Sequence, residues 1–423
     1  MTGKQATRRG PADAASAGDS GFDLIEQGGS RFLALAPFLR LNLAGVDLRP
    51  IANVLLAATR RDQDNVLLWL NLATLFFTLG ENRLAFAMQA EALARQRLYA
   101  VAAARQPAAA RLLVIVAPGD LAQNMPIDCL LEDSRIDLLF YFAVADQPLP
   151  QPLPEHDAVL VAVAQMAETE SLLRALEKAL ADSGKPVINR PQAIFNVERV
   201  TASRLLQGIP GLAMPLTAPV TRAALAAIAA GEATLTRVCA DCRFPVILRP
   251  IGSHAGHGLE KIEQAQNFSD YLSSVPENEF YISRFIDYQS ADGLFRKYRI
   301  ALVGGIPFIA HMAISSHWMI HYLNAGMYED EHKRREEACF MDNFPAFAAK
   351  HGPALRGIYQ RAGLDYFCVD CAETPDGDLL VFEIDHAMVV HAMDSAKRFP
   401  HKPRHILKIR EAVENLILNP GSP

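Results

Sequence analysis

The chain has 423 residues, of which 50% are hydrophobic and 21% are charged, and its formal net charge is −6. This length allows two to four domains with sizeable cores, and the composition is that of an ordinary globular protein. The acidic balance argues against general nucleic-acid binding, and no apolar run approaches the roughly 18 residues of a membrane span. We expect a cytoplasmic protein with neither nucleic-acid nor membrane partners.

The first part of the chain predicts a tail followed by helices. Residues 1–20 are basic, then small and polar, without the apolar stretch of a signal peptide, so we expect a disordered tail. From 21 to 108 the stretch "NVLLWLNLATLFFTLGENRLAFAMQAEALARQ" shows helical spacing, with a break at "LGEN". Five residues fall near the signature positions of a tetratricopeptide helix pair: Trp69, Leu72, Phe76, Gly80 and Ala85.

A single helical repeat cannot bury both of its faces. We therefore expect this helical hairpin unit to pack on the rest of the chain or on a second copy. A homodimer, or a peptide or protein partner bound by the helical unit, would follow from that need.

After the helices the pattern changes to strands. Between 109 and 191, short apolar runs alternate with helical stretches, which predicts a small parallel sheet covered by helices. The regions 192–290 and 291–423 contain a helix in "ERVTASRLLQGIPG", several strands, a long hairpin around "VGGIP" and a last helix over 404–418. The expected fold class is therefore α/β and α+β, with a two-lobed domain after the parallel sheet.

The stretch "LDYFCVDCAETPDGDLLVFEIDHAM", residues 364–388, predicts a β-hairpin. Asp376 and Gly377 fit the two central positions of a type I′ turn, because both positions need a positive φ. With that turn, Asp370 lies opposite Glu383. Because side chains alternate between the two faces along each strand, every second residue of the hairpin lies on the same face.

Three carboxylates then lie together on one face of the hairpin: Asp370, Glu383 and Asp385. Like charges placed opposite each other destabilise a sheet, so we expect a cation between them. Hard oxygen donors suit Mg²⁺, with Mn²⁺ as an alternative. The other interpretation is a solvent-facing hairpin with hydrated acids.

A glycine-containing loop lies between two predicted strands in "PVILRPIGSHAGHGLEKI", residues 245–262. Glycines allow a backbone to approach phosphate oxygens closely, although a single such loop is weak evidence. It is followed by "FYISRFI", "KYRIALVGG" and the acidic hairpin. This order resembles the ATP-grasp superfamily, which includes D-alanine:D-alanine ligase, glutathione synthetase and the ribosomal-protein glutamate ligases, over about 110–418.

The resemblance implies a pre-ATP-grasp domain at 109–191 and an ATP-grasp domain with a small lobe at 192–290 and a large lobe at 291–423. It implies ATP and Mg²⁺ as cofactors, with Asp370, Glu383 and Asp385 as metal ligands. It also implies the residues that bind ATP: Arg199, Arg249, Gly252, Ser253, Gly256, Gly258, Ser283, Arg284, Phe285 and Ile286.

The implied activity is ligation of a small-molecule or peptide carboxylate to an amine or thiol through an acyl phosphate. Arg299 would face phosphate or substrate, and His311 would replace a family arginine that is missing at Ala313. Arg199 and Arg249 stand where many relatives carry lysine, and Lys297 stands where an acid often holds ribose. These departures leave two alternatives: a nucleotide-binding scaffold with a protein partner, or a phosphotransferase acting on a hydroxyl.

The stretch "SSHWMIHYLNAGMYEDEHKRREE", 315–337, falls where such ligases contact the acceptor. We expect substrate contacts from four residues: His317, His321, Asn324 and His386. His254 is expected at the edge of the same site. The charged run in this stretch predicts a solvated helix face or a mobile lid.

The six cysteines include two C-x-x-C spacings, one at 239–242 and one at 368–371. The second pair would lie on opposite faces of a strand, which excludes a shared metal. We expect reduced, structural cysteines at all of these positions.

Overall fold

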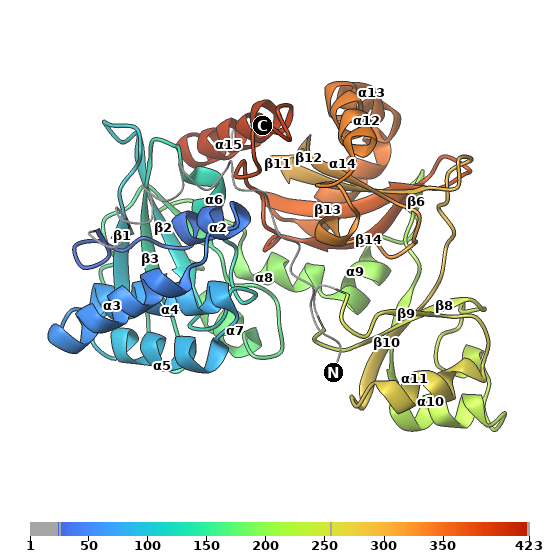
Figure 1. The fold of residues 1–423 in the computed structure, drawn as a ribbon. Helices are drawn as coiled ribbons and strands as arrows, with labels where there is room; N and C mark the ends of the chain where they lie inside the picture. The colour runs from blue at the N-terminus through green and yellow to red at the C-terminus, as the bar shows by residue number, and fades with distance from the viewer. Residues whose placement is uncertain (1–23, 25–26, 254–255, 421–423) are drawn as a thin grey trace. The chain divides into compact units, whose positions relative to one another are not determined.

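The computed structural model describes residue 24 and residues 27–253 and 256–420, and it has the expected mixed α/β and α+β composition (Figure 1). The described residues form two compact units. The expected tail at 1–20 and the predicted site residue His254 lie outside the described residues. Within the described ranges, no helix is both long and apolar enough to cross a membrane.

The two units divide the chain more coarsely than the expected domains. The first unit takes its described residues from Met1–Ala164, Ser171–Ile188 and Ala387–Pro423. The second consists of Gln165–Glu170 and Asn189–His386. The finer division into a tail, a helical domain, a pre-ATP-grasp domain and two lobes stays a prediction.

Helices α2 to α5 lie in the first part of the described chain. The predicted helix pair is confirmed as α4 (Val66–Leu79) and α5 (Asn82–Leu93). Asn65 caps the start of α4, and Gly80 ends it in the left-handed conformation, which glycine adopts without steric strain. Two shorter helices precede the pair: α2 (Ala36–Leu43) and α3 (Arg49–Arg61).

A five-stranded sheet forms the centre of the first unit, in the order β1-β3-β2-β4-β5. Its strands are β1 (Leu98–Val101), β2 (Ala110–Val116), β3 (Ile136–Phe142), β4 (Ala158–Val161) and β5 (Val187–Ile188). The parallel pairing of β3, β2, β4 and β5 confirms the predicted parallel sheet.

Strand β1 corrects the expectation that 21–108 is helical throughout. It pairs antiparallel with β3 at the sheet edge. Tyr99 is only 2% exposed there, because its ring packs against Phe32 and Phe142. The strand has only four residues and begins shortly after helix α5 ends, so the helical periodicity of the sequence did not reveal it.

Three further helices of the first unit are α6 (Ile127–Leu131), α7 (Glu170–Ala179) and α15 (Lys402–Leu418). The expected last helix is confirmed, but it packs on α6 and β2. We expected it in the large lobe, and it instead belongs to the first unit.

The second unit contains a four-stranded antiparallel sheet in the order β7-β10-β8-β9. Its strands are β7 (Thr217–Thr221), β8 (Val246–Pro250), β9 (Glu260–Ile262) and β10 (Glu279–Arg284). Helices α10 (Arg222–Ala229) and α11 (Asn267–Ser274) pack on it (Figure 1). Cys239 and Cys242 lie in the core between them and form a disulfide, which corrects the expectation of reduced thiols.

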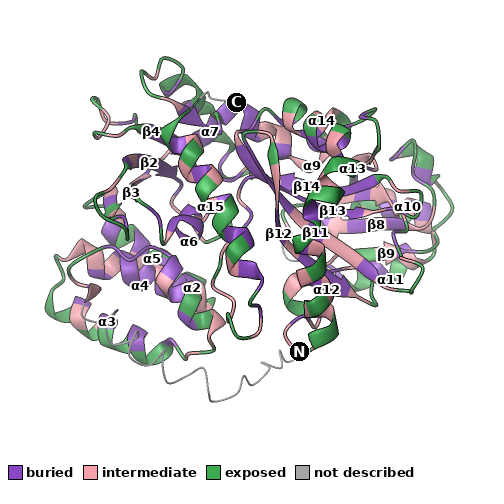
Figure 2. Cartoon of the chain, turned by 90° about the horizontal axis from the view of Figure 1, so that it is seen from above, coloured by how far each residue is buried: buried purple, intermediate pink, exposed green. Residues whose placement is uncertain are grey.

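The other sheet of this unit has five strands in the order β12-β11-β13-β14-β6. Its strands are β6 (Leu212–Ala213), β11 (Phe295–Val303), β12 (Ile306–Ser315), β13 (Tyr366–Glu373) and β14 (Leu379–Asp385). Figure 2 shows that β13 is buried along its length, so both of its faces are covered. The helices of this part are α8 (Pro191–Ile194), α9 (Arg199–Leu205), α12 (Glu331–Asp342), α13 (Phe344–Lys350) and α14 (Gly352–Ala362).

The acidic hairpin β13–β14 forms as predicted, but with a different turn. Thr374 pairs with Asp378 around a three-residue loop, and of its residues only Gly377 has a positive φ. The type I′ turn predicted at Asp376–Gly377 is therefore wrong. A bulge after Asp370 then shifts the register by one residue, which restores the predicted pairing of Asp370 with Glu383.

Candidate functional site

A cavity of about 750 Å³ lies within the second unit. Of the predicted site residues, fourteen line it: Arg199, Arg249, Gly252, Ser253, Gly256, Ser283, Arg284, Phe285, Ile286, Arg299, His321, Asp370, Glu383 and Asp385. Five other predicted residues, all within the described ranges, do not line it: Gly258, His311, His317, Asn324 and His386. The structure thus brings most of the predicted site together.

The glycine loop after β8 requires its glycines. Gly252 and Gly256 both have φ of 76°, and Gly258 has φ of 62°, where a side chain is strained. A Cβ atom on Gly256 would lie 3.0 Å from Sδ of Met319. A Cβ atom on Gly258 would lie 2.8 Å from the ring of Pro250, so this glycine serves the loop's packing.

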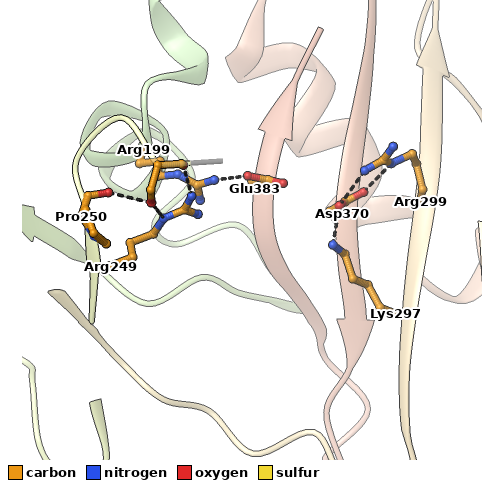
Figure 3. A network of polar contacts seen from close by, with 8 residues as sticks. Arg199, Arg249, Pro250, Lys297, Arg299, Asp370 and Glu383 are labelled. Carbon is orange, nitrogen blue, oxygen red and sulfur yellow. Dashed lines mark hydrogen bonds and ion pairs between the residues drawn. The ribbon is translucent and has the colours of Figure 1, made fainter. Parts of the chain in front are cut away.

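Arg249 holds the loop from the end of β8. Its Nε donates to Oγ of Ser253 at 3.2 Å, its Nη2 donates to the Ser253 carbonyl, and Oγ of Ser253 donates to the Pro250 carbonyl at 2.8 Å (Figure 3). Burial and the nearby Arg199 lower the pKa of Arg249 to about 10. The guanidinium is therefore a buried positive charge. Among the described residues, its hydrogen-bond acceptors are two oxygens of Ser253, and neither belongs to an acid.

Arg199 begins helix α9 and forms an ion pair with Glu383 of β14. Glu198 caps the same helix by accepting from the backbone N–H groups of Val200 and Thr201, which fixes the first turn. Burial raises the pKa of Glu383, but the charges of Arg199, Lys297 and Arg249 together outweigh it, and the pKa is lowered overall. Both side chains of the pair are 30% exposed, so they remain accessible from the cavity.

Asp370 is fully buried and contacts two cations. Arg299, which lies directly opposite on β11, donates from Nε at 2.8 Å and from Nη2 at 3.0 Å. Nζ of Lys297 lies 2.6 Å from Oδ2 of the same carboxylate (Figure 3). Burial would raise the pKa of Asp370, but these two cations hold it well below its usual range.

These contacts correct one inference from the sequence. The acidic face does not need a metal to balance its charge, because Arg199, Lys297 and Arg299 already neutralise Asp370 and Glu383. The three basic residues come from segments far from the hairpin in sequence. Lys297 carried no site prediction, although its place two residues before Arg299 on β11 puts both side chains on one face.

The donor set fits Mg²⁺ in part. Each oxygen of Asp370 already accepts hydrogen bonds from cations, which disfavours it as a metal ligand. Glu383 and Asp385 both line the cavity, and the Asp385 side chain is 37% exposed. Because Mg²⁺ usually takes one or two protein carboxylates and completes its shell with waters and phosphates, these two residues fit it.

Ser283–Ile286, at and after the end of β10, lines the cavity as predicted for a hinge that contacts a nucleobase. Apolar side chains of both sheets accompany it there, including Ile247 and Leu380. The ring of Phe285 lies edge-on to Trp318 with centroids 5.8 Å apart. Apolar side chains that line this part of the cavity suit a flat heterocycle.

The predicted acceptor segment contacts the cavity through Trp318, Met319, Ile320 and His321. It is anchored: Tyr322 donates to the buried Glu337 on α12 at 3.1 Å. The charged run that follows is the helix α12, not a lid. His317 and Asn324 make hydrogen bonds within the segment itself.

His311 does not occupy the place expected of it. It pairs with Arg299 across β11 and β12, and its ring packs on Tyr322 with centroids 4.7 Å apart. Because it does not line the cavity, the expected replacement for the family arginine is wrong. The structure adds Tyr281, whose hydroxyl donates to Glu198 at 3.0 Å beside the two arginines.

No family model matches this chain, and no curated protein matches it. Among solved structures, VanG D-Ala:D-Ser ligase from Enterococcus faecalis is 13% identical, with 71% of this chain and 99% of that chain covered and a TM-score of 0.42. A RimK domain ATP-grasp protein from Sphaerobacter thermophilus is 17% identical, with coverages of 73% and 100% and a TM-score of 0.40. D-alanine–D-alanine ligase from Bacillus anthracis, complexed with ATP, is 14% identical, with coverages of 72% and 99% and a TM-score of 0.40. The chain is thus similar to ATP-grasp ligases.

Proposed function

We propose that this chain binds ATP with Mg²⁺ in the cavity of its second unit and acts as an ATP-grasp ligase. The proposed reaction joins a carboxylate to an amine or thiol through an acyl phosphate. One observation carries the proposal: Arg199, Arg249 and the glycine loop meet the acidic hairpin at a single cavity.

In this proposal the nucleotide phosphates bind at Arg199, Arg249 and the backbone of the glycine loop. Arginine offers a planar fork of N–H donors that matches phosphate oxygens, so it can replace the family's lysines. The segment Ser283–Ile286 binds the base. The nucleotide thereby takes the place of Glu383 as the partner of Arg199.

The chemistry needs charge stabilisation more than it needs a base. A carboxylate oxygen attacks the γ-phosphorus and ADP leaves; the nucleophile then attacks the acyl carbon and phosphate leaves with one carboxylate oxygen. Mg²⁺, held by Glu383 and Asp385, would neutralise charge on the transferred phosphoryl group. Arg299, oriented by Asp370, would face the acid substrate from the large sheet.

A nucleotide-binding scaffold without turnover is the second candidate. It is favoured by the position of His311, which leaves the missing arginine at Ala313 without a replacement in the cavity. The two candidates differ in whether an acid is activated.

Isotope transfer tests the proposal. Full-length protein would be incubated with ATP, Mg²⁺ and pooled ¹⁸O-labelled carboxylic acids and amines, and the released phosphate analysed by mass spectrometry. The ligase proposal expects phosphate that carries one ¹⁸O atom in at least one pool. Turnover of ATP with unlabelled phosphate in every pool would contradict the acyl phosphate, and binding of ATP without turnover would favour the scaffold.

A further inference from the structure

The cavity contains two separate groups of cations. Arg199 and Arg249 lie together on the side of the glycine loop, whereas Lys297 and Arg299 lie on the far side of the acidic hairpin (Figure 3). Glu383 and Asp370 stand between the groups. A phosphate chain bound at the first group therefore leaves the second group for another ligand.

Lys297 and Arg299, which form the second group, both contact one carboxylate, that of Asp370. The neighbouring acid Glu383 is paired with Arg199. The side chains of Lys297 and Arg299 are only 18% and 20% exposed. Two mostly buried cations that share one carboxylate favour a further anionic ligand at this position.

The ammonium group of Lys297 has more N–H donors than it uses within the described part of the chain. Its ammonium group has three N–H donors, and within the described part of the chain its one polar partner is Asp370, at 2.6 Å. Asp370 is 0% exposed and fixes the position of the ammonium group, and the side chain of Lys297 lines the cavity. The remaining donors are available to a ligand.

His321 adds a neutral donor next to these cations. Its ring accepts a hydrogen bond from the backbone N–H of Asn324, which requires a lone pair and hence a neutral ring. The other ring nitrogen then carries the proton. Burial lowers the pKa of His321, and the charges of Lys297 and Arg299 lower it further, in agreement with that state. His321 lines the cavity as a hydrogen-bond donor and not as a base.

We infer that Lys297, Arg299 and His321 form a subsite for a second carboxylate of the acid substrate, with Asp370 as the residue that positions the two cations. The inference rests on the proposed function and names its substrate class: an acid with two carboxylates. One carboxylate reacts near the phosphates, and the other binds in this subsite.

Calorimetry with matched acids tests the subsite. Full-length protein with Mg²⁺ and a non-hydrolysable ATP analogue would be titrated with glutarate and with butyrate, which differ by one carboxylate. We expect wild type to bind glutarate at least tenfold more tightly. Lys297→Met should abolish that preference, Lys297→Arg should keep most of it, and Lys350→Met should leave it unchanged, because Lys350 also pairs with a carboxylate but lies outside the cavity.

Two results would overturn the subsite: equal binding of both acids by wild type, or a preference that survives Lys297→Met. If Lys297→Met does not fold, His321→Leu provides the same comparison, with loss of the preference expected. Titration of the ATP analogue alone separates this test from the proposed function. A preference for glutarate without nucleotide binding would contradict the proposed ligase function and support the subsite. Nucleotide binding without the preference would contradict the subsite and leave the proposed function standing.

Discussion

Arg299 and Asp370 face each other directly across β11 and β13, and the guanidinium binds the buried carboxylate through two N–H groups. Removing one partner of a buried ion pair leaves the other charge uncompensated. In Asp370→Asn, the amide would also place N–H groups against Lys297 or Arg299. We expect this variant to lose about 3–5 kcal/mol of unfolding free energy in the absence of metal and nucleotide.

Urea unfolding of wild type and Asp370→Asn would measure this loss. The matched control is Asp292→Asn: Asp292 is exposed, and its partner Arg296 keeps Glu336, so the midpoint should change far less. An Asp370→Asn variant as stable as wild type, or more stable, would support the opposite interpretation, in which the acids repel one another until a metal binds.

Glu383→Gln should affect binding more than folding. The substitution releases Arg199, whose pair with Glu383 is partly exposed, so metal-free nucleotide should bind more tightly than in wild type. The gain from adding Mg²⁺ should shrink, because one proposed ligand is lost. Calorimetry with ATP in EDTA and in Mg²⁺ would show both effects.

Glu373→Gln is the control for this change, since Glu373 lies on the same hairpin and pairs with Lys350 and His351 outside the cavity. If Mg²⁺ strengthened nucleotide binding equally in wild type and Glu383→Gln, Glu383 would not be a metal ligand.

Gly256→Val should weaken nucleotide binding by tenfold or more. The side chain would be strained at φ of 76° and would meet Met319, so the loop could not keep its shape against a phosphate. Gly208→Val imposes similar strain at φ of 73° but lies outside the cavity. Comparable losses of affinity in both variants would show that strain alone, and not the loop, governs binding.

The pairing of the acidic hairpin could be predicted from sequence, although its turn could not. A three-residue loop and a bulge each shift the register by one residue, and the two shifts cancel at Asp370 and Glu383. Alternation of side chains therefore placed the acids on the correct face. The bulge itself has no local sequence signal strong enough to detect.

The partners of these acids could not be predicted because they are distant in the chain. Arg299 is 71 residues from Asp370, and Arg199 is 184 residues from Glu383. Periodicity and turn chemistry describe neighbours along one strand or helix, whereas these ion pairs depend on strand order in the sheet and on the placement of α9. The motif order located the cavity, but the charge balance inside it required the structure.

A buried acid in the first unit should make stability depend on pH. Asp128 accepts the backbone N–H groups of Leu35 and Ala36, both at 2.7 Å, and burial raises its pKa to about 6. Between about pH 4 and 6 the folded state binds the proton more tightly than the unfolded state, so this residue's contribution to stability falls as pH rises.

Asp128→Asn keeps an oxygen acceptor and removes the charge. We expect the difference in unfolding free energy between variant and wild type to change in the variant's favour by an amount on the order of 2 kcal/mol from pH 4 to pH 7. Urea unfolding at several pH values would measure it. A difference that stays constant with pH would show that Asp128 titrates normally.

Titration calorimetry with a non-hydrolysable ATP analogue and Mg²⁺ would show whether Arg249 and the glycine loop bind nucleotide phosphates. We predict saturable one-to-one binding to wild type, at least tenfold weaker binding to Arg249→Met, and wild-type affinity for Arg361→Met, whose arginine binds backbone carbonyls outside the cavity. Binding of the analogue with equal affinity to wild type and Arg249→Met, or no binding to either, would show that Arg249 does not bind the phosphates.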